Sequence, residues 1–153
     1  MKNYYGDEVM EKRFRNPSFG YIDSHGNAHV NWASENDDVD NDGFDKHHEE
    51  VAGGYKQEIL LPYGTLICRY GNVRGRLTTD IGSDYDKLSL PYVMESVEYH
   101  VYKVIADGVQ KKCMVQRGKV APMFDSPGGA VQYKHYQSIA KELDDGVLME
   151  VHL

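Results

Sequence analysis

The chain of 153 residues lacks several features that usually define a protein class. No run of about 18 apolar residues occurs, which excludes a transmembrane helix. Only two cysteines are present, Cys68 and Cys113, so neither a disulfide framework nor a Cys-x-x-Cys zinc motif exists, while one bridge and two free thiols both stay open. The Gly-x-Gly-x-x-Gly and phosphate-loop motifs are also missing, which excludes a standard Rossmann or kinase-like nucleotide site.

Positive charge is scarce as well. The sequence has 24 Asp and Glu against 17 Lys and Arg, a net charge of -7, and this acidic excess argues against nucleic acid as the main partner. The excess is uneven, because residues 1–57 carry 12 acidic and 6 basic side chains whereas residues 58–153 carry 12 and 11. We therefore expect an acidic, loop-rich segment 1–57 that packs on a nearly neutral β-rich core, 58–153, within one domain.

Glycine and tyrosine are abundant where proline is not, with 15 glycines, 12 tyrosines and 5 prolines. This composition is typical of aromatic strands joined by many turns and not of a helical bundle. We expect two strands within residues 59–70 and one strand over 97–105. In the latter strand, alternation places Val101 and Ile105 on an apolar face and His100 on the opposite face.

Two helices and a hairpin complete the expected elements. Residues 7–15 carry acidic residues first and basic residues last, as the helix dipole prefers, so we expect a short N-terminal helix there. Apolar residues at helical spacing predict a second helix over 136–143, which Gly146 caps, and a final strand follows at 147–151. The Asp-Gly pair at 107–108 is typical of a hairpin turn. The sequence thus predicts a β-rich α+β domain with mostly antiparallel strands.

One acidic stretch matches a metal-binding pattern. The motif D-x-D-x-D-G-x5-E between residues 38 and 49 fits the twelve-residue calcium loop of an EF-hand, in which carboxylate oxygens suit a hard cation. The eighth position of the loop, usually aliphatic, is Asp45, and glycine-rich flanks replace the two helices of an EF-hand. A solvated acidic loop and a calcium site both stay open, and the former is the commoner explanation. The candidate calcium ligands are Asp38, Asp40, Asp42 and Glu49.

Two later segments place polar side chains beside glycine turns. Arg69 and Tyr70 end an expected strand and point to opposite faces, unless Gly71 permits a turn that brings both to one rim. At such a rim a guanidinium can hold a phosphate and an aromatic ring can stack on a planar group. Gln132 follows the glycine turn at 127–129, a place where glutamine is ordinarily a surface residue. Taken alone, neither segment identifies a function.

The motifs gain meaning from their order. They are Asn41-Asp42-Gly43-Phe44, Leu61-Pro62-Tyr63-Gly64, Arg69-Tyr70-Gly71, Leu90-Pro91, Tyr99-His100-Val101-Tyr102 and Pro127-Gly128-Gly129-Ala130-Val131-Gln132-Tyr133. In this order they resemble the tuberculosis necrotizing toxin family of NAD glycohydrolase domains, which stand at the C-terminus of many bacterial toxins. The resemblance covers roughly residues 41–151.

The resemblance implies roles for individual residues. It implies that Gln132 and Arg69 are the catalytic residues, with Arg69 also a ligand of the dinucleotide phosphates. Tyr70 is then a wall of the nicotinamide pocket, and His100 falls where the family can carry a site histidine.

A second cationic contact is less clearly placed. The family often has an arginine before its Leu-Pro element, where this chain has Leu88. Lys87, Arg74 or Arg76 is expected to replace it, and we include Arg74 and Lys87 among the expected substrate-binding residues.

The activity implied by the resemblance is hydrolysis of NAD+ or NADP+ to ADP-ribose, or its phosphate, and nicotinamide. NAD+ is then the substrate, no cofactor is required, and a target cell loses its NAD. An ADP-ribosyltransferase and a non-enzymatic, calcium-dependent interaction module are the alternatives. The expected partner is a cognate immunity protein, with no nucleic acid and no membrane insertion. Because residues 1–20 lack the apolar core of a secretory signal, we expect the C-terminal domain of a larger secreted toxin or delivery by a dedicated secretion system.

Overall fold

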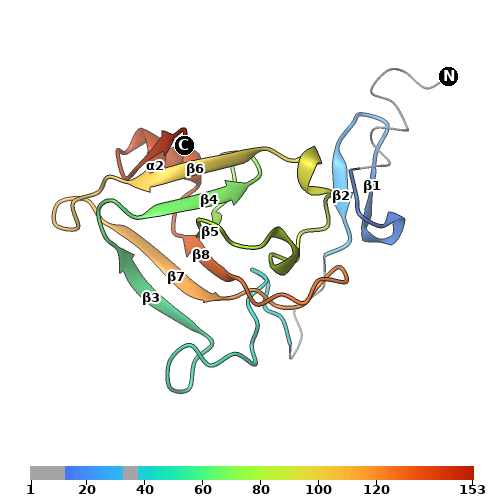
Figure 1. Cartoon of the computed structure of the whole chain (residues 1–153), viewed down its shortest axis with the longest axis horizontal. Coiled ribbons are helices and arrows are strands. Elements are labelled where there is room, and N and C mark those ends of the chain that lie inside the picture. The colour runs from blue at the N-terminus through green and yellow to red at the C-terminus, as the bar shows by residue number, and fades with distance from the viewer. Residues whose placement is uncertain (1–12, 33–37) are drawn as a thin grey trace.

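A computed structural model describes residues 13–32 and 38–153, and within them seven strands form one sheet. The strands are β3 (Lys56–Leu61), β4 (Leu66–Tyr70), β5 (Leu77–Asp80), β6 (Tyr99–Val104), β7 (Cys113–Lys119), β8 (Val131–His135) and β9 (Leu148–Val151). Their order across the sheet is β3-β7-β8-β5-β4-β6-β9, and every neighbouring pair is antiparallel. Strands β3 and β7 run at a steep angle to β4 and β6, so the sheet curls strongly (Figure 1). The predicted β-rich α+β class is confirmed.

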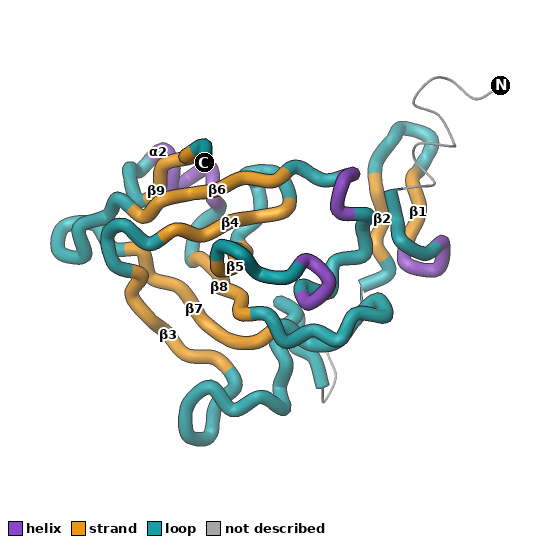
Figure 2. The backbone as a smooth tube through the Cα atoms, in the orientation of Figure 1, coloured by secondary structure: helices purple, strands orange, loops and turns teal. Residues whose placement is uncertain are grey.

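The remaining elements are short and are joined by long loops (Figure 2). They are the 3-10 turns η1 (Pro17–Phe19), η2 (Tyr85–Lys87) and η3 (Met94–Ser96), the hairpin β1 (Gly20–Ile22) and β2 (Ala28–Val30), and the helix α2 (Ile139–Asp144). The Ser138 side chain caps α2 by accepting the Lys141 N–H, and Gly146, at φ 72°, ends it as expected. No helix among the described residues is long and apolar enough to cross a membrane.

One face of the curled sheet carries the hydrophobic core. Residues directly opposite each other on antiparallel strands share a face, and the pair Ile67 and Tyr102 is fully buried in the core cluster. Val104 lies on the same face of β6 and is also fully buried. The expected assignment of faces in residues 97–105 is therefore wrong. His100 lies on the core side of β6, at the edge where that face reaches solvent. The prediction failed because the curl of the sheet, and not the local alternation of Val and Tyr, decides which face is covered.

One further expectation needs correction, and another falls mostly outside the described residues. The Asp-Gly pair at 107–108 does form a turn, in which the Asp107 carboxylate accepts three backbone N–H groups. However, the strands that it joins, β6 and β7, are not neighbours in the sheet, so the turn is a connection across the curl and not a hairpin. Most of the expected helix 7–15 lies outside the described residues, and residues 13–15 form a turn, a bridge and a bend.

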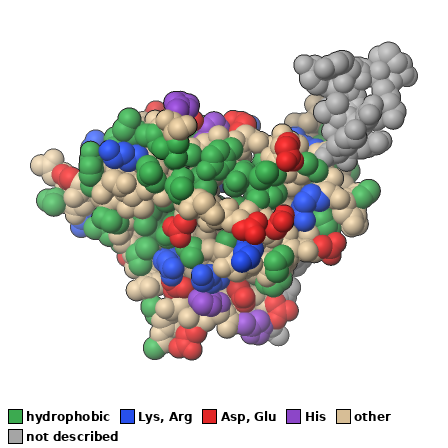
Figure 3. Space-filling model, in the orientation of Figure 1, with side chains coloured by type: hydrophobic (Ala, Val, Ile, Leu, Met, Phe, Trp, Pro, Cys, Tyr) green, Lys and Arg blue, Asp and Glu red, His purple; other side chains and the backbone are tan. Residues whose placement is uncertain are grey.

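The contacts of the N-terminal segment with the core include one polar and one apolar anchor. Arg15 donates hydrogen bonds to the carbonyls of Leu90 and Phe124 and to the Ser126 hydroxyl. Phe44 is fully buried and bridges to Val120. On the face shown in Figure 3, acidic and basic side chains are interspersed below a band of hydrophobic ones.

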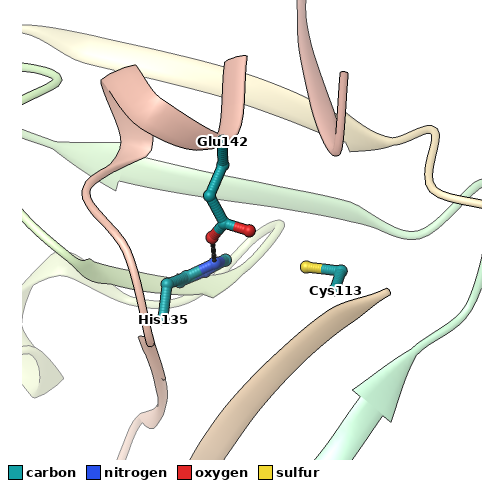
Figure 4. A group of neighbouring side chains, drawn as sticks. All are labelled: Cys113, His135 and Glu142. Carbon is teal, nitrogen blue, oxygen red and sulfur yellow. Dashed lines mark hydrogen bonds and ion pairs between the residues drawn. The ribbon is translucent and has the colours of Figure 1, made fainter. Parts of the chain in front are cut away.

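A buried polar cluster joins α2 to the sheet (Figure 4). His135 on β8 is fully buried, its Nδ1 lies 2.5 Å from the Glu142 carboxylate of α2, and its Nε2 lies 2.7 Å from the Thr78 hydroxyl. The Cys113 thiol lies beside this pair. One possible ligand atom from each of Cys113, His135 and Glu142 lies within 4.8 Å of the other two. Both imidazole nitrogens already have hydrogen-bond partners, so we interpret the cluster as a structural clamp and not as a metal site.

Both cysteines are free. Cys68 and Cys113 are buried separately, and burial raises the pKa of each thiol, to about 12 for Cys113. Neither thiol is therefore an activated nucleophile.

Candidate active site

Two adjoining cavities lie against the sheet face opposite the core. The wider one measures about 280 Å³ and reaches Trp32 and the Asn41–Gly43 loop. The narrower one measures about 80 Å³ and reaches Arg69 and Tyr70. Both cavities are lined by Leu77, Leu88, Leu90 and Gln132. Gln132 therefore stands where the two cavities adjoin, and together we call them the cleft.

The amide of Gln132 has a fixed orientation. The residue is buried on β8, and its Nε2 donates a hydrogen bond to the main-chain carbonyl of Asp42 at 3.0 Å. A carbonyl oxygen only accepts, so the NH2 group must face Asp42. The Oε1 atom of Gln132 is then the acceptor that the side chain offers to the cleft.

The Asn41–Phe44 motif explains how Asp42 reaches Gln132. Phe44 fills the hollow above Gly118 of β7, where an added Cβ would lie 2.6 Å from the Phe44 ring. Gly43 takes φ +87°, a conformation that favours glycine, and brings the loop back over β8. The Asp42 carboxylate also pairs with Lys134 at 2.8 Å. An anchored aromatic ring and an ion pair thus hold the Asp42 carbonyl over Gln132.

The glycine turn before β8 has an equally specific cause. Gly128 has φ +68°, and an added Cβ would lie 2.5 Å from the Val120 carbonyl oxygen. Only glycine fits this close approach of two backbones. On the neighbouring strand, the Thr79 hydroxyl donates to the carbonyl of Val131 at 2.6 Å, one residue before Gln132. The turn and this hydrogen bond fix where Gln132 enters the cleft.

Arg69 borders the narrow cavity but uses its guanidinium locally. Its Nε donates to the Asn72 carbonyl at 2.6 Å and its Nη1 to the Leu77 carbonyl at 2.9 Å. The group packs over Gly75, where a Cβ would lie 2.0 Å from Nη2. Burial lowers the pKa of Arg69 from its usual value. Arg69 and Tyr70 lie on opposite faces of β4. Through its two backbone contacts, Arg69 holds the loop that presents Leu77 to the cleft.

Tyr70 forms an aromatic wall at the other end of the narrow cavity. Its ring lies 4.8 Å from the ring of Tyr85 and 4.8 Å from that of Tyr99, in edge-on and tilted contacts. Burial raises the pKa of Tyr70, so its phenol is neutral near pH 7. The Tyr85 hydroxyl donates to the Tyr92 carbonyl, which fixes this group of rings.

The other expected substrate-binding residues do not line these two cavities. His100 is paired with Glu150 at 2.7 Å and with Glu98 at 2.9 Å, and these contacts, Glu150 first, raise its pKa. Arg74 and Lys87 are exposed. The structure thus brings Gln132, Tyr70 and Arg69 together at the narrow cavity and leaves the other three residues apart.

The expected calcium ligands are engaged separately. Asp40 is buried, accepts the N–H of Phe44 and pairs with Lys56 at 3.3 Å. Asp38 pairs with His47, Asp42 pairs with Lys134, and Glu49 accepts the N–H of Gly53. Among the described residues, no three of these four carboxylates gather as a group that could hold a metal ion. The acids stabilise the loop against its own backbone and neighbouring cations.

Sequence reasoning missed two residues of the cleft. Trp32 lines the wide cavity from the β2 end of the N-terminal segment, and Met123 lines it from the loop before β8. Neither belongs to a periodic pattern. The one available signal was that Trp32 is the only tryptophan in the chain.

A family model places the chain among known proteins. The sequence model of the family described as "Tuberculosis necrotizing toxin" matches residues 60–151, more than half of the chain. The chain belongs to this family. The family span includes β4 to β9 and therefore Arg69, Tyr70 and Gln132. It does not include Trp32 or the Asn41–Phe44 loop.

The chain is also similar to a fungal protein over part of its length. The conidial surface nicotinamide adenine dinucleotide glycohydrolase nadA of Aspergillus fumigatus is 33% identical over 95 residues, which are 58% of this chain and 38% of that protein. The chain therefore matches well under half the length of this relative.

Among solved structures, the tuberculosis necrotizing toxin complexed with its immunity factor IFT aligns with a TM-score of 0.56 and 18% identity, covering 97% of this chain and 74% of that one. This likeness supports the fold. Rhs1-CT in complex with its cognate immunity protein RhsI1 aligns with a TM-score of 0.45 and 16% identity, over 64% of this chain and 78% of that one.

Proposed function

We propose that this member of the toxin family is an NAD+ glycohydrolase, which hydrolyses the bond between nicotinamide and ribose to give nicotinamide and ADP-ribose. The observation that carries the proposal is the position of Gln132. Its oriented amide stands where an aromatic-walled pocket meets a wider cleft. The likeness to a named NAD glycohydrolase supports the same activity.

The bond to be broken needs little acid catalysis. Nicotinamide leaves from a cationic pyridinium as a neutral molecule, so no group has to protonate it. The remaining demand is to position the ribose and to support the positive charge that develops on it in the oxocarbenium-like transition state. Water then supplies the hydroxyl at C1 of the ribose and releases a proton.

Gln132 meets that demand as a neutral acceptor. One N–H of its Nε2 is donated to the Asp42 carbonyl, which orients the amide so that Oε1 accepts a hydrogen bond from a ribose hydroxyl or from the attacking water. A pre-oriented acceptor loses no reorganisation energy when the transition state forms. A neutral amide also does not form a lasting ion pair with the cation, which favours water as the final acceptor.

Tyr70 and Arg69 complete the proposed site in different ways. Tyr70 orients the nicotinamide ring by stacking within the narrow cavity. Arg69 keeps the Asn72–Leu77 loop in place through its two backbone contacts. These contacts favour a positioning role for Arg69 over a direct contact with the pyrophosphate.

The biological setting follows from the same proposal. The chain acts as a toxin domain that is secreted or delivered into target cells, where it depletes NAD, and a cognate immunity protein protects the producer. Structures of an immunity-bound family toxin with the same fold support such a partner. We propose that turnover requires no metal, since the acidic loop residues pair with lysine, histidine and backbone groups instead of facing the cleft together.

One assay tests the proposed function. The protein is incubated with etheno-NAD+, with and without EDTA, and nicotinamide release and labelling of protein are both measured. We expect complete release of nicotinamide, no labelled protein and no effect of EDTA. Labelled protein would indicate the transferase alternative, and loss of turnover in EDTA would indicate a metal-dependent protein. Stable NAD+ throughout would contradict the glycohydrolase assignment.

A further inference from the structure

Trp32 stands at the wall of the wide cavity and not in the core. It is 58% exposed, and its ring meets the ring of Phe124 edge-to-face, with centroids 5.6 Å apart. This contact leaves more than half of the residue accessible from the cavity side and from solvent. An indole held in this way offers a surface on which a flat aromatic group can stack.

The support beneath Trp32 is unusually constrained. Phe124 and Asp125 both have positive φ, at 53° and 61°, and this conformation is uncommon for an aromatic residue such as Phe124, whereas aspartate tolerates it. The Phe124 carbonyl accepts a hydrogen bond from Arg15 at 2.9 Å, and its ring packs against Phe19 at 5.2 Å. Such strain persists only where the surroundings enforce it, and it concentrates at ligand-binding sites. The surroundings thus hold Phe124 in the position that supports the Trp32 ring.

The order of residues along the cleft indicates what Trp32 contacts. Of the two cavities that meet at Gln132, Tyr70 lines the narrow one and Trp32 lines the wide one, whereas Gln132 lines both. With nicotinamide at Tyr70 and the reacting ribose at Gln132, the rest of the dinucleotide must extend into the wide cavity. The only other flat aromatic group of NAD+ is adenine.

We propose that Trp32 is the platform on which the adenine base of NAD+ stacks, and that the segment before the family-matched residues 60–151 thereby takes part in substrate binding. This assignment rests on the proposed glycohydrolase function. It makes Trp32 a binding residue that acts on substrate affinity, because adenine is remote from the bond that breaks. The cleft then holds one aromatic contact at each end and the reacting bond between them.

Steady-state kinetics with two substrates tests the assignment. Nicotinamide mononucleotide contains the same reacting bond as NAD+ but lacks the adenosine part. We expect Trp32→Ala to raise KM for NAD+ about tenfold, as stacking on one base usually contributes, with kcat little changed. The kinetics with nicotinamide mononucleotide should stay as in the parent, and Trp32→Phe should retain most of the affinity. An equal loss with both substrates, or no loss with NAD+, would overturn the assignment.

Tyr21 provides a matched control. It is also an aromatic residue of the β1–β2 region and is also 58% exposed, but it stacks on His29 and does not line the cleft. Tyr21→Ala should leave both substrates unaffected. If Tyr21→Ala raised KM for NAD+ as much as Trp32→Ala, a general disturbance of the hairpin would explain both effects, and the specific assignment would be wrong.

A direct binding measurement separates this proposal from the proposed function. Because Trp32 is the only tryptophan, its fluorescence reports on this site alone. Titration with AMP should change the tryptophan emission saturably, whereas ribose 5-phosphate, which has no base, should not. An unchanged emission with AMP would refute the adenine platform even in an active enzyme. A saturable change in a protein that hydrolyses neither substrate would support the platform and contradict the glycohydrolase function.

Discussion

At the scale of single residues, the proposed site depends on side chains whose freedom has been removed. Gln132 has one amide orientation because the Asp42 carbonyl accepts from its NH2 group. That carbonyl is in place because Phe44 lies in the hollow at Gly118. The position of the Gln132 amide therefore depends on the packing of Phe44 against Gly118. We expect substitutions at these residues to change the geometry of the cleft.

Gly118→Ala tests this chain of contacts. The new methyl group would lie 2.6 Å from the Phe44 ring and 2.8 Å from the Tyr55 carbonyl oxygen, so Phe44 must move. We expect the free energy of unfolding to fall by about 1–3 kcal/mol, as overpacking usually costs, and NAD+ turnover to fall in protein that is still folded. Urea unfolding and initial rates at low temperature measure the two effects.

Gly54→Ala is the matched control for this prediction. An added Cβ there meets Val51 at 3.2 Å and nothing else closer than 3.7 Å, so a small shift of one side chain accommodates it. If Gly118→Ala were as stable and as active as Gly54→Ala, Phe44 would not determine the position of Gln132.

At the scale of secondary-structure elements, contacts with the rest of the domain stabilise a helix that is too short to be stable alone. The helix α2 has only six residues, too few to be stable by itself. It is held against the sheet by Ile139, which is fully buried in the hydrophobic core, and by the contact between Glu142 and the buried His135. Sequence periodicity predicted this helix and its glycine cap, but it did not reveal the clamp, because His135 and Glu142 come from different elements.

Glu142→Ala should therefore lower the free energy of unfolding of the domain. The change leaves Nδ1 of a fully buried imidazole without its partner, which usually costs about 1–3 kcal/mol. Lys141→Ala on the same helix removes only an exposed pair with Asp145 and should cost about 0.5 kcal/mol or less. Urea unfolding of both variants provides the comparison, and equal losses would contradict the clamp.

The edge formed by β6 and β9 should make stability depend on pH. Glu150 and then Glu98 raise the pKa of His100 above its ordinary value. A histidine whose folded pKa is raised contributes stability that is fully present below the unfolded pKa, near 6.5, and is lost as the pH rises through the folded value. The stability advantage of the parent over His100→Gln should thus be largest near pH 6 and should shrink towards pH 8.

Chemical denaturation across this pH range measures the effect. His25→Gln, a change in the exposed β1–β2 turn, is the control and should follow the pH profile of the parent. A constant difference between the parent and His100→Gln from pH 6 to pH 8 would show that the histidine is not stabilised by its two carboxylate neighbours.

At the scale of the whole molecule, the acidic segment and the neutral core are less separate than their charges suggest. Residues of the first 57 line the wide cavity beside residues of the core. Their acids are paired largely with cations or backbone groups, as Asp40 is with Lys56 and Asp42 with Lys134. The net charge of the first 57 residues therefore did not reveal that Asp40 and Asp42 are paired with lysines.

The sequence was most informative where local chemistry decides the structure. Glycine turns, the strands within 59–70 and the closing helix and strand follow from spacing and backbone freedom, and the motif order indicated the family and Gln132. Other features depend on the curl of the sheet and on contacts between distant segments. These are the direction of the Arg69 side chain, the environment of His100 and the position of Trp32 at the cleft. No pattern within a short stretch of sequence records these contacts.

Replacing Gln132 shows whether this residue performs the proposed reaction. Nicotinamide release from NAD+ is measured for the parent, for Gln132→Ala and for Gln110→Ala, a change at an exposed glutamine outside the cleft, with thermal unfolding as a check on folding. We expect kcat of Gln132→Ala to fall about a hundredfold or more, as for loss of one oriented contact to a transition state, while Gln110→Ala stays at the parental rate. A folded Gln132→Ala protein that releases nicotinamide as fast as the parent would show that Gln132 does not perform the proposed reaction.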